Sequence, residues 1–309
     1  MPHPLPRCRV VPLPEFQFAF EIDHREVTRW CFPPNIPRPY FFPVTGPSGA
    51  CLTRMGHPGA PNHDHHRSFW FAHNDVIGQD FWAEGKPPRI AQTQWYAIED
   101  TDEFARVAFE LIWTDGHDPR PLLKQDVFAT VRPLENHQWT LELQNDFRSN
   151  GEGIAFRKSN FGIMGLRVAE SLSVVFGGGH ITGADGAAGE AKLFGNANRW
   201  VDYSGPVAAS PDGSLTEEGL CLIDHANNPG HPVKWHVRDD GWIGPSLSRD
   251  ADVMVDPGKT LTARYMLLVH AGGPNAKLTE QVAGDFDRRP LLKVQKGSKP
   301  HHQWEIVEA

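Results

Sequence analysis

Short segments of this chain alternate between apolar and polar residues. The alternating segments are 16–22, 107–113 and 139–144, and residues 262–270 form a further apolar run. Side chains two apart in a strand point to the same face, so a period of two predicts a strand with one buried face. We therefore expect β-strands in all four segments.

Helical spacing is rare by comparison. Leu278, Val282 and Phe286 recur at spacing four and predict one short helix near 276–287. The 29 glycines and 27 prolines are spread along the chain and divide it into many short segments, as all-β folds require. We expect an all-β fold, a large β-sandwich with at most one or two short helices. Long loops are expected at 33–62, 115–122, 177–190 and 224–246.

No linker or internal repeat divides the chain. We expect a single β-sandwich domain over residues 1–295, followed by a polar C-terminal tail, 296–309, that is frayed at its start. The net charge of −8 comes without a basic run, which argues against a nucleic-acid partner. No apolar run reaches membrane-spanning length and the N-terminus lacks the apolar core of a signal peptide. A cytoplasmic protein without a membrane partner is expected.

The four cysteines are scattered and contain no C-x-x-C pair, which argues against a cysteine-built zinc site or a disulfide framework. The chain also lacks a dinucleotide-binding glycine motif, a phosphate-binding loop, a nucleophile elbow and the H-E-x-x-H metal motif. These absences remove several enzyme classes.

Histidines concentrate in residues 62–73, which include His63, His65, His66 and His73 beside Arg67. Imidazole carries protons near neutral pH and binds transition metals. In an extended segment His63 and His65 share a face and, with one distant ligand, would hold a divalent metal. His66 would face the other way unless a turn re-aims it. Equally, the imidazoles and the guanidinium would surround a hydroxyl-rich substrate. The third reading is a hydrogen-bonded polar cluster.

The residues after this cluster mix aromatic and polar side chains, as sugar sites do. Indole rings cover the apolar C–H face of a sugar, and carboxylates bind its hydroxyls. The candidates are Trp70, Asp80, Trp82 and Glu84. Phe69, Phe71 and Phe81 are expected in the core.

A second concentration of histidines lies in residues 224–242, where the candidates are His225, Asn228, His236 and Arg238. If this part forms a strand, His236 and Arg238 share one face and Trp235 and Val237 the other. Asp202, within 199–205, is a third candidate. Sandwiches gather loops at the ends of their sheets, so we expect the two histidine-rich segments to share one pocket.

Several of these motifs resemble a bacterial family often labelled methane oxygenase PmoA-like. The resemblance covers most of the chain, in order, through residues 38–49, 63–82, 199–205, 224–244 and 262–270. The membrane subunit of methane oxygenase requires transmembrane spans, so the label does not indicate that activity. The resemblance implies a sugar-catabolic setting, beside sugar dehydrogenases, and a sandwich of the galactose-mutarotase kind.

Two family motifs can be followed residue by residue. The family shows Asp-His-Pro-His-His-Arg where this chain has residues 62–67, so Asn62 and Asp64 depart from it while three histidines and the arginine remain. The later motif, Asp-His-Pro-x-Asn-Pro-x-His-Pro-x-x-Trp-His-x-Arg, maps onto residues 224–238. If the family's aspartate binds a metal or a proton, its replacement by Asn62 alters that role.

Together these patterns predict a carbohydrate-active enzyme that uses histidine acid/base chemistry on a small sugar or oxidised (keto) sugar. The reaction would be epimerisation, elimination or hydration, or hydrolysis. His66 and His236 are the acid/base candidates, Arg67 and Arg238 stabilise negative charge, and Trp70 and Trp82 stack on the ring. The expected substrate-binding residues are His63, His65, His73, Asp80, Glu84, Asp202, His225 and Asn228. A metal-dependent enzyme with a divalent metal at His63 and His65, and a non-catalytic carbohydrate-binding protein, are the alternatives.

Overall fold

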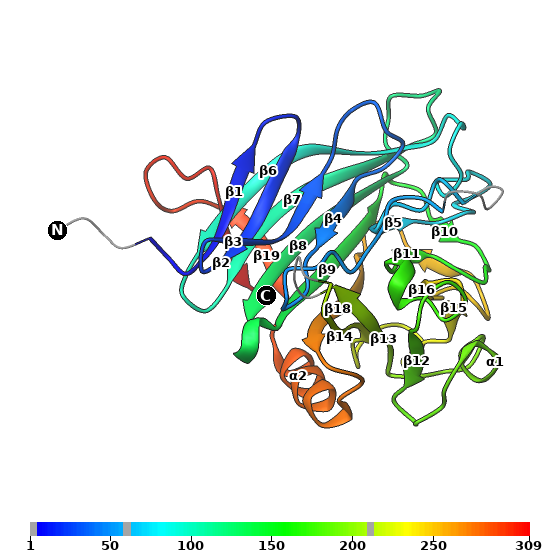
Figure 1. Cartoon of the computed structure of the whole chain (residues 1–309). Helices are drawn as coiled ribbons and strands as arrows, with labels where there is room; N and C mark the ends of the chain where they lie inside the picture. The colour runs from blue at the N-terminus through cyan, green and yellow to red at the C-terminus, as the bar shows by residue number, and fades with distance from the viewer. Residues whose placement is uncertain (1–4, 58–62, 209–212) are drawn as a thin grey trace.

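The computed structural model describes residues 5–57, 63–208 and 213–309. Two eight-stranded antiparallel sheets pack face to face as a large β-sandwich (Figure 1). The first sheet consists, in spatial order, of β1 (Cys8–Leu13), β2 (Gln17–Ile22), β3 (Arg25–Cys31), β4 (Tyr40–Val44), β5 (Phe69–Ala72), β11 (Ile163–Arg167), β16 (Trp242–Pro245) and β15 (Trp235–Arg238). The all-β prediction is confirmed.

The second sheet carries the longer strands. In spatial order it consists of β12 (His180–Gly183), β13 (Trp200–Ala208), β14 (Leu215–Asp224), β18 (Leu261–Ala271), β9 (Trp139–Ser149), β8 (Leu123–Pro133), β7 (Ala105–Thr114) and β6 (Arg89–Asp100). Two further strands, β10 (Ile154–Phe156) and β17 (Val253–Val255), form a separate antiparallel pair. Three of the four loops expected from the sequence therefore contain short strands: β4, β12, β15 and β16.

The core lies between the two sheets and follows the predicted alternation. Val107, Phe109, Leu111 and Trp113 on β7 are all fully buried there. Phe18 and Phe20 of β2 are buried as well, whereas Phe16 is 55% exposed because it precedes the strand, in a turn where its φ is 60°. Phe69, Phe71 and Phe81 belong to this core, as expected.

The outer face of the second sheet is covered by two elements. Helix α2 (Ala276–Arg288) begins at Asn275, whose side chain accepts a hydrogen bond from the Leu278 backbone N–H, and buries Val282 and Phe286 against β13, β14 and β18 (Figure 1). This is the helix that the sequence predicts. The other described helices are short: α1 (Glu190–Leu193) and the 3₁₀ turns η1 (Glu135–His137) and η2 (Glu170–Leu172). No helix in the described ranges has the length and apolar character needed to cross a bilayer.

The C-terminal residues form the second covering element. Strands β19 (Leu292–Lys296) and β20 (Trp304–Glu308) pair as an antiparallel hairpin, and Ile306 packs on Ala108 and Phe128 of the second sheet. The boundary expected at 295/296 falls inside this hairpin, and residues 304–308 are ordered where the sequence suggested a polar tail. Each strand has few apolar residues, so the alternation is too short to stand out from the polar sequence around it.

Candidate functional site

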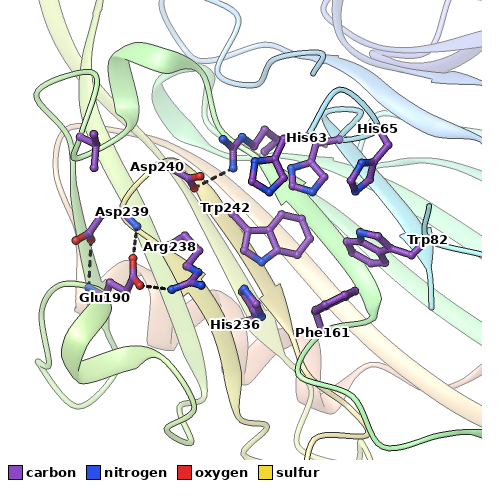
Figure 2. A pocket seen from close by; sticks show the side chains of 13 residues that line it. His63, His65, Trp82, Phe161, Glu190, His236, Arg238, Asp239, Asp240 and Trp242 are labelled. Carbon is purple, nitrogen blue, oxygen red and sulfur yellow. Dashed lines mark hydrogen bonds and ion pairs between the residues drawn. The ribbon is translucent and has the colours of Figure 1, made fainter. Parts of the chain in front are cut away.

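A cleft of about 570 Å³ opens on the outer face of the first sheet, over β11, β16 and β15 (Figure 2). Its lining comes from six separate parts of the chain. The lining residues are His63, His65, His66, Trp82, Phe161, Arg167, Val175, Glu190, His236, Arg238, Asp239, Asp240 and Trp242. The size lies within the range of about 300–1,000 Å³ that is typical of pockets for small organic ligands.

Three of the imidazoles come from one turn. The His66 backbone N–H donates to the His63 carbonyl at 3.1 Å, so residues 63–66 turn instead of extending. The turn brings His66 to the same cleft as its two neighbours, with ring centroids 5.0 Å from His63 and 4.5 Å from His65. The guanidinium of the fully buried Arg38 donates to the His65 carbonyl at 2.7 Å and fixes the turn in place. Of the two cases that the sequence left open, the turn that re-aims His66 is therefore the one present.

The floor beneath these histidines is aromatic. His66 stacks on both indoles, those of Trp70 and Trp242, at centroid distances of 5.3 and 5.0 Å, and the indoles contact each other at 5.3 Å. The two indoles lie over Gly165 of β11, where any side chain would collide with them. Glycine at this position therefore allows the floor to pack directly on the backbone of the sheet.

The second histidine-rich segment reaches the same floor from β15. Its burial alternates as predicted, with Trp235 and Val237 in the core and His236 and Arg238 on the outer face. The His236 ring lies edge-on to Trp242 at 5.9 Å. Since His66 and His236 both contact Trp242, the two segments share one cleft, as Figure 2 shows.

Burial keeps several of these imidazoles unprotonated at neutral pH. It lowers the pKa of His65 to about 4, with the Arg38 charge adding to the effect. Burial and the neighbouring Arg238 lower the pKa of His236 to about 4. The pKa of His66 lies further below its usual value, because burial combines with repulsion from His65 and Arg167. A neutral imidazole can accept a proton or a hydrogen bond, which suits a base better than an acid.

Charged side chains surround the histidines in pairs. Arg238 donates to a Glu190 carboxylate oxygen at 2.6 Å, and Arg167 donates to Oδ1 of Asp240 at 2.9 Å. Arg167 is fully buried, and a second of its N–H groups donates to Nδ1 of His57, which also accepts from Arg54 at 2.8 Å. Two guanidinium groups thus meet at one imidazole, and burial together with their charges lowers the pKa of His57.

The sequence did not point to Arg167, Asp239, Asp240 or Glu190. The two aspartates follow His236 and Arg238 directly, in the turn that ends at Gly241 with a φ of 102°. An Asp-Asp-Gly turn directly after His236 and Arg238 was the sequence feature that could have indicated these two aspartates. Arg167 and Glu190 had none, because only the pairing of β11, β16 and β15 brings them to the cleft.

Four predicted residues in this part of the chain, Arg67, Trp70, Asp80 and Glu84, lie outside the cleft lining. Arg67 makes a two-pronged ion pair with Glu84 at 2.7 and 3.1 Å, so its charge is already neutralised. Asp80 accepts hydrogen bonds from the backbone N–H groups of Trp82 and Ala83 and pairs with Lys86. These contacts hold the segment that presents Trp82. Trp70, only 1% exposed, supports His66 from behind.

Four more predicted residues lie away from the cleft lining. His73 bonds to Ser248 at 2.9 Å and is buried. Asp202 pairs with His270 at 2.7 Å inside the second sheet. His225 contacts Arg264 at 2.8 Å, and Asn228 donates to Asp224 at 2.8 Å, near helix α2. Their hydrogen bonds account for them as parts of the fold.

The metal hypothesis for His63 and His65 finds no third ligand in residues 5–57, 63–208 and 213–309. Within these ranges no group of three or more histidine, cysteine, aspartate or glutamate side chains is arranged to hold a metal ion. Asn62, which replaces the aspartate of the resembling family, lies outside the described residues.

Comparison with known proteins gives a family and two distant structures. A family model described as a family of unknown function (DUF6807) matches residues 17–284. No curated protein matches the sequence. The heparan sulfate lyase HepC from Pedobacter heparinus aligns with 95% of this chain and 36% of its own, at 8% identity and a TM-score of 0.34. A protein described as a kojibiose phosphorylase, from the human microbiome, aligns with 89% of this chain and 32% of its own, at 10% identity and a TM-score of 0.33.

The chain thus spans about a third of the length of either structure. At these TM-scores neither one carries an argument about activity. The PmoA-like label stays a resemblance, because the matching family model bears only the description of unknown function.

Proposed function

The chain belongs to the DUF6807 family, whose function is unknown, and we propose that it is an enzyme that removes a proton from a sugar or an oxidised sugar derivative. One observation carries the proposal: neutral imidazoles from two distant segments meet over a single indole in one cleft. An apolar floor and a set of polar groups at its edge are what a sugar ring requires, because each ring has C–H faces and a rim of hydroxyls.

The charges of the cleft favour an uncharged ligand. Its two guanidinium groups, on Arg167 and Arg238, are both paired with carboxylates. A third carboxylate, Asp239, accepts a hydrogen bond from the backbone N–H of Glu190. Since no lining cation among the described residues lacks a carboxylate partner, an anionic substrate would find little attraction here. Hydroxyl groups, in contrast, can donate to the carboxylates and to neutral imidazole nitrogens.

The lowered pKa values leave His66 and His236 unprotonated at neutral pH, which is the form that a proton-abstracting base needs. A carbon next to the carbonyl of a keto sugar gives its proton to a base, and the electron pair moves onto the carbonyl oxygen as an enolate. We assign the base to His236, with His66 as the alternative, and a hydrogen bond to the enolate oxygen to Arg238, which bonds Glu190 through one nitrogen and has further N–H groups to donate. Both epimerisation and β-elimination begin with this step. Hydrolysis would need a proton donor, a role for which an imidazole with a pKa of about 4 is poorly suited at neutral pH.

Hydrogen exchange in D₂O tests this step without knowledge of the final product. Keto derivatives of glucose and galactose are incubated with the protein, and loss of the proton signal beside the carbonyl is followed by NMR. We expect His236→Ala to slow the exchange by about a hundredfold or more. His117→Ala serves as the control, because His117 is an exposed loop residue outside the cleft. Binding without any exchange would favour the non-catalytic carbohydrate-binding alternative, and equal rates in both variants would exclude His236 as the base.

A further inference from the structure

Two exposed apolar side chains stand at the rim of the cleft. Val175 is 60% and Phe176 51% exposed, and Val175 belongs to the cleft lining. They lie between η2 and β12. Apolar side chains of this size are usually buried, and exposed ones grouped at the edge of a pocket commonly mark a binding surface.

The backbone holds this pair in its exposed position. The N–H groups of Val174 and Val175 both donate to the Asp239 carbonyl, at 2.9 and 3.0 Å. After the pair, a Cβ at Gly177 would overlap the carbonyl of Ser171, and a Cβ at Gly179 would overlap the carbonyl of Leu172. The chain packs there without room for a side chain. The segment is thus fastened at both ends, and one fastening point is a residue of the cleft itself.

A series of ring contacts connects Phe176 with the floor of the cleft. Phe176 packs edge-on against His57 at 5.2 Å, and His57 against His63 at 5.9 Å. His63 stacks on His66 at 5.0 Å, and His66 on Trp242 at 5.0 Å. Ring contacts therefore link Trp242 of the floor to Phe176 through His57, which is buried and lies outside the cleft lining. Val175 lines the cleft, and Phe176 lies directly beside it on the surface.

We infer that Val175 and Phe176 form a second subsite, which receives a second ring joined to the sugar in the cleft. The substrate class is then a glycoside, with a sugar or aryl group as its second ring, and not a free monosaccharide. This inference rests on the proposed function. The chemistry of the rim is the reason: the pair offers apolar contact alone, which fits the C–H face of a second sugar or the face of an aromatic group.

Paired glycosides test the inference. Binding of methyl and phenyl glucosides and galactosides, in both anomeric forms, is measured by calorimetry. The phenyl glycoside of the sugar that binds should bind about tenfold more tightly than its methyl counterpart, as one ring contact provides. The double variant Val175→Ser/Phe176→Ser should lose this advantage and keep its affinity for the methyl glycoside. Both side chains are more than half exposed and contribute little to the core, so the variant should fold. Circular dichroism checks this.

Val174→Ser is the matched control, because Val174 is exposed on the same segment but lies outside the cleft lining. It should retain the preference for phenyl. The inference is overturned if wild type shows no preference, or if the double variant keeps it. If methyl glycosides bind in either case, the cleft remains a sugar site and the hydrogen-exchange assay decides the proposed function separately. If no glycoside or keto sugar binds, the proposed function fails and the inference fails with it.

Discussion

Gly165 offers a direct test of how the cleft floor is built. It lies on β11, and a Cβ placed there would be 2.6 Å from Cζ3 of Trp242 and 2.8 Å from Cζ2 of Trp70. Ordinary contacts begin at 3.4 Å, so Gly165→Ala must push the Trp242 indole away by at least about 0.8 Å. The indole cannot retreat freely, because it packs against His66 at 5.0 Å and Trp82 at 5.3 Å.

Overpacking of this kind costs about 1–3 kcal/mol in the free energy of unfolding. For a chain of this size we expect Tm to fall by roughly 2–6 °C. The movement also displaces His66, which stacks on Trp242, and a shift approaching 1 Å in a catalytic site can cost up to about a hundredfold in rate. We therefore expect slower proton exchange into the keto sugar as well as the lower Tm.

Thermal unfolding, near-ultraviolet circular dichroism and the exchange assay measure these three effects. Gly153→Ala is the control, because its Cβ would meet only Met254 and Pro257, at 3.6 and 3.7 Å. That variant should match wild type. A Gly165→Ala protein with unchanged Tm and an unchanged aromatic spectrum would refute the packing argument. A lower Tm with full activity would show that the position of the aromatic floor does not limit proton exchange.

Three further predictions concern charge and the C-terminus. As pH falls from 6.5 towards 4, the unfolded chain gains a proton on His236 that the folded chain excludes, so the free energy of unfolding should fall by about 1.4 kcal/mol per pH unit from this group. Urea unfolding between pH 7.5 and 5 should show a smaller slope for His236→Gln, and equal slopes would contradict the lowered pKa. Asp240→Ala should cost about 3–5 kcal/mol, because it leaves the Arg167 guanidinium fully buried and without its carboxylate. Arg167→Met should cost less, since the Asp240 carboxylate is 29% exposed, and denaturant midpoints in the opposite order would count against this account. Removal of residues 291–309 uncovers the outer face of β7 and β8 and should lower the free energy of unfolding by at least about 2 kcal/mol. Urea unfolding measures this change, and a truncated protein as stable as wild type would mean that these residues add no stability.

Local patterns were sufficient for most of the fold. The period of two in residues 107–113 depends only on which neighbours are apolar, and the strand β7 buries those four side chains between the sheets. The same rule placed His236 and Arg238 on one face of β15. Helix α2 followed from the spacing of four between its apolar residues. These features are decided within a few residues along the chain, which is why sequence reasoning reaches them.

The hydrogen-bond and ion-pair partners of the polar side chains could not be predicted from such local patterns. Arg67 sits inside the histidine motif but pairs with Glu84, whereas Arg167, a hundred residues later, lines the cleft. The sequence made the first the better candidate. An ion pair depends on distances through space, and these were set when β5, β11 and β16 became neighbours in one sheet.

The sequence by itself determined the strands β2, β7, β9 and β18, the long helix and the concentration of imidazoles in two segments. Only the tertiary structure decided that a turn aims His63, His65 and His66 into one cleft, that Gly165 lets two indoles form its floor, and that burial keeps the pKa of His236 near 4. The physical reason is the range of the interactions. Alternation and capping act between residues close in the chain, whereas desolvation and ring packing depend on every element that folds against the site.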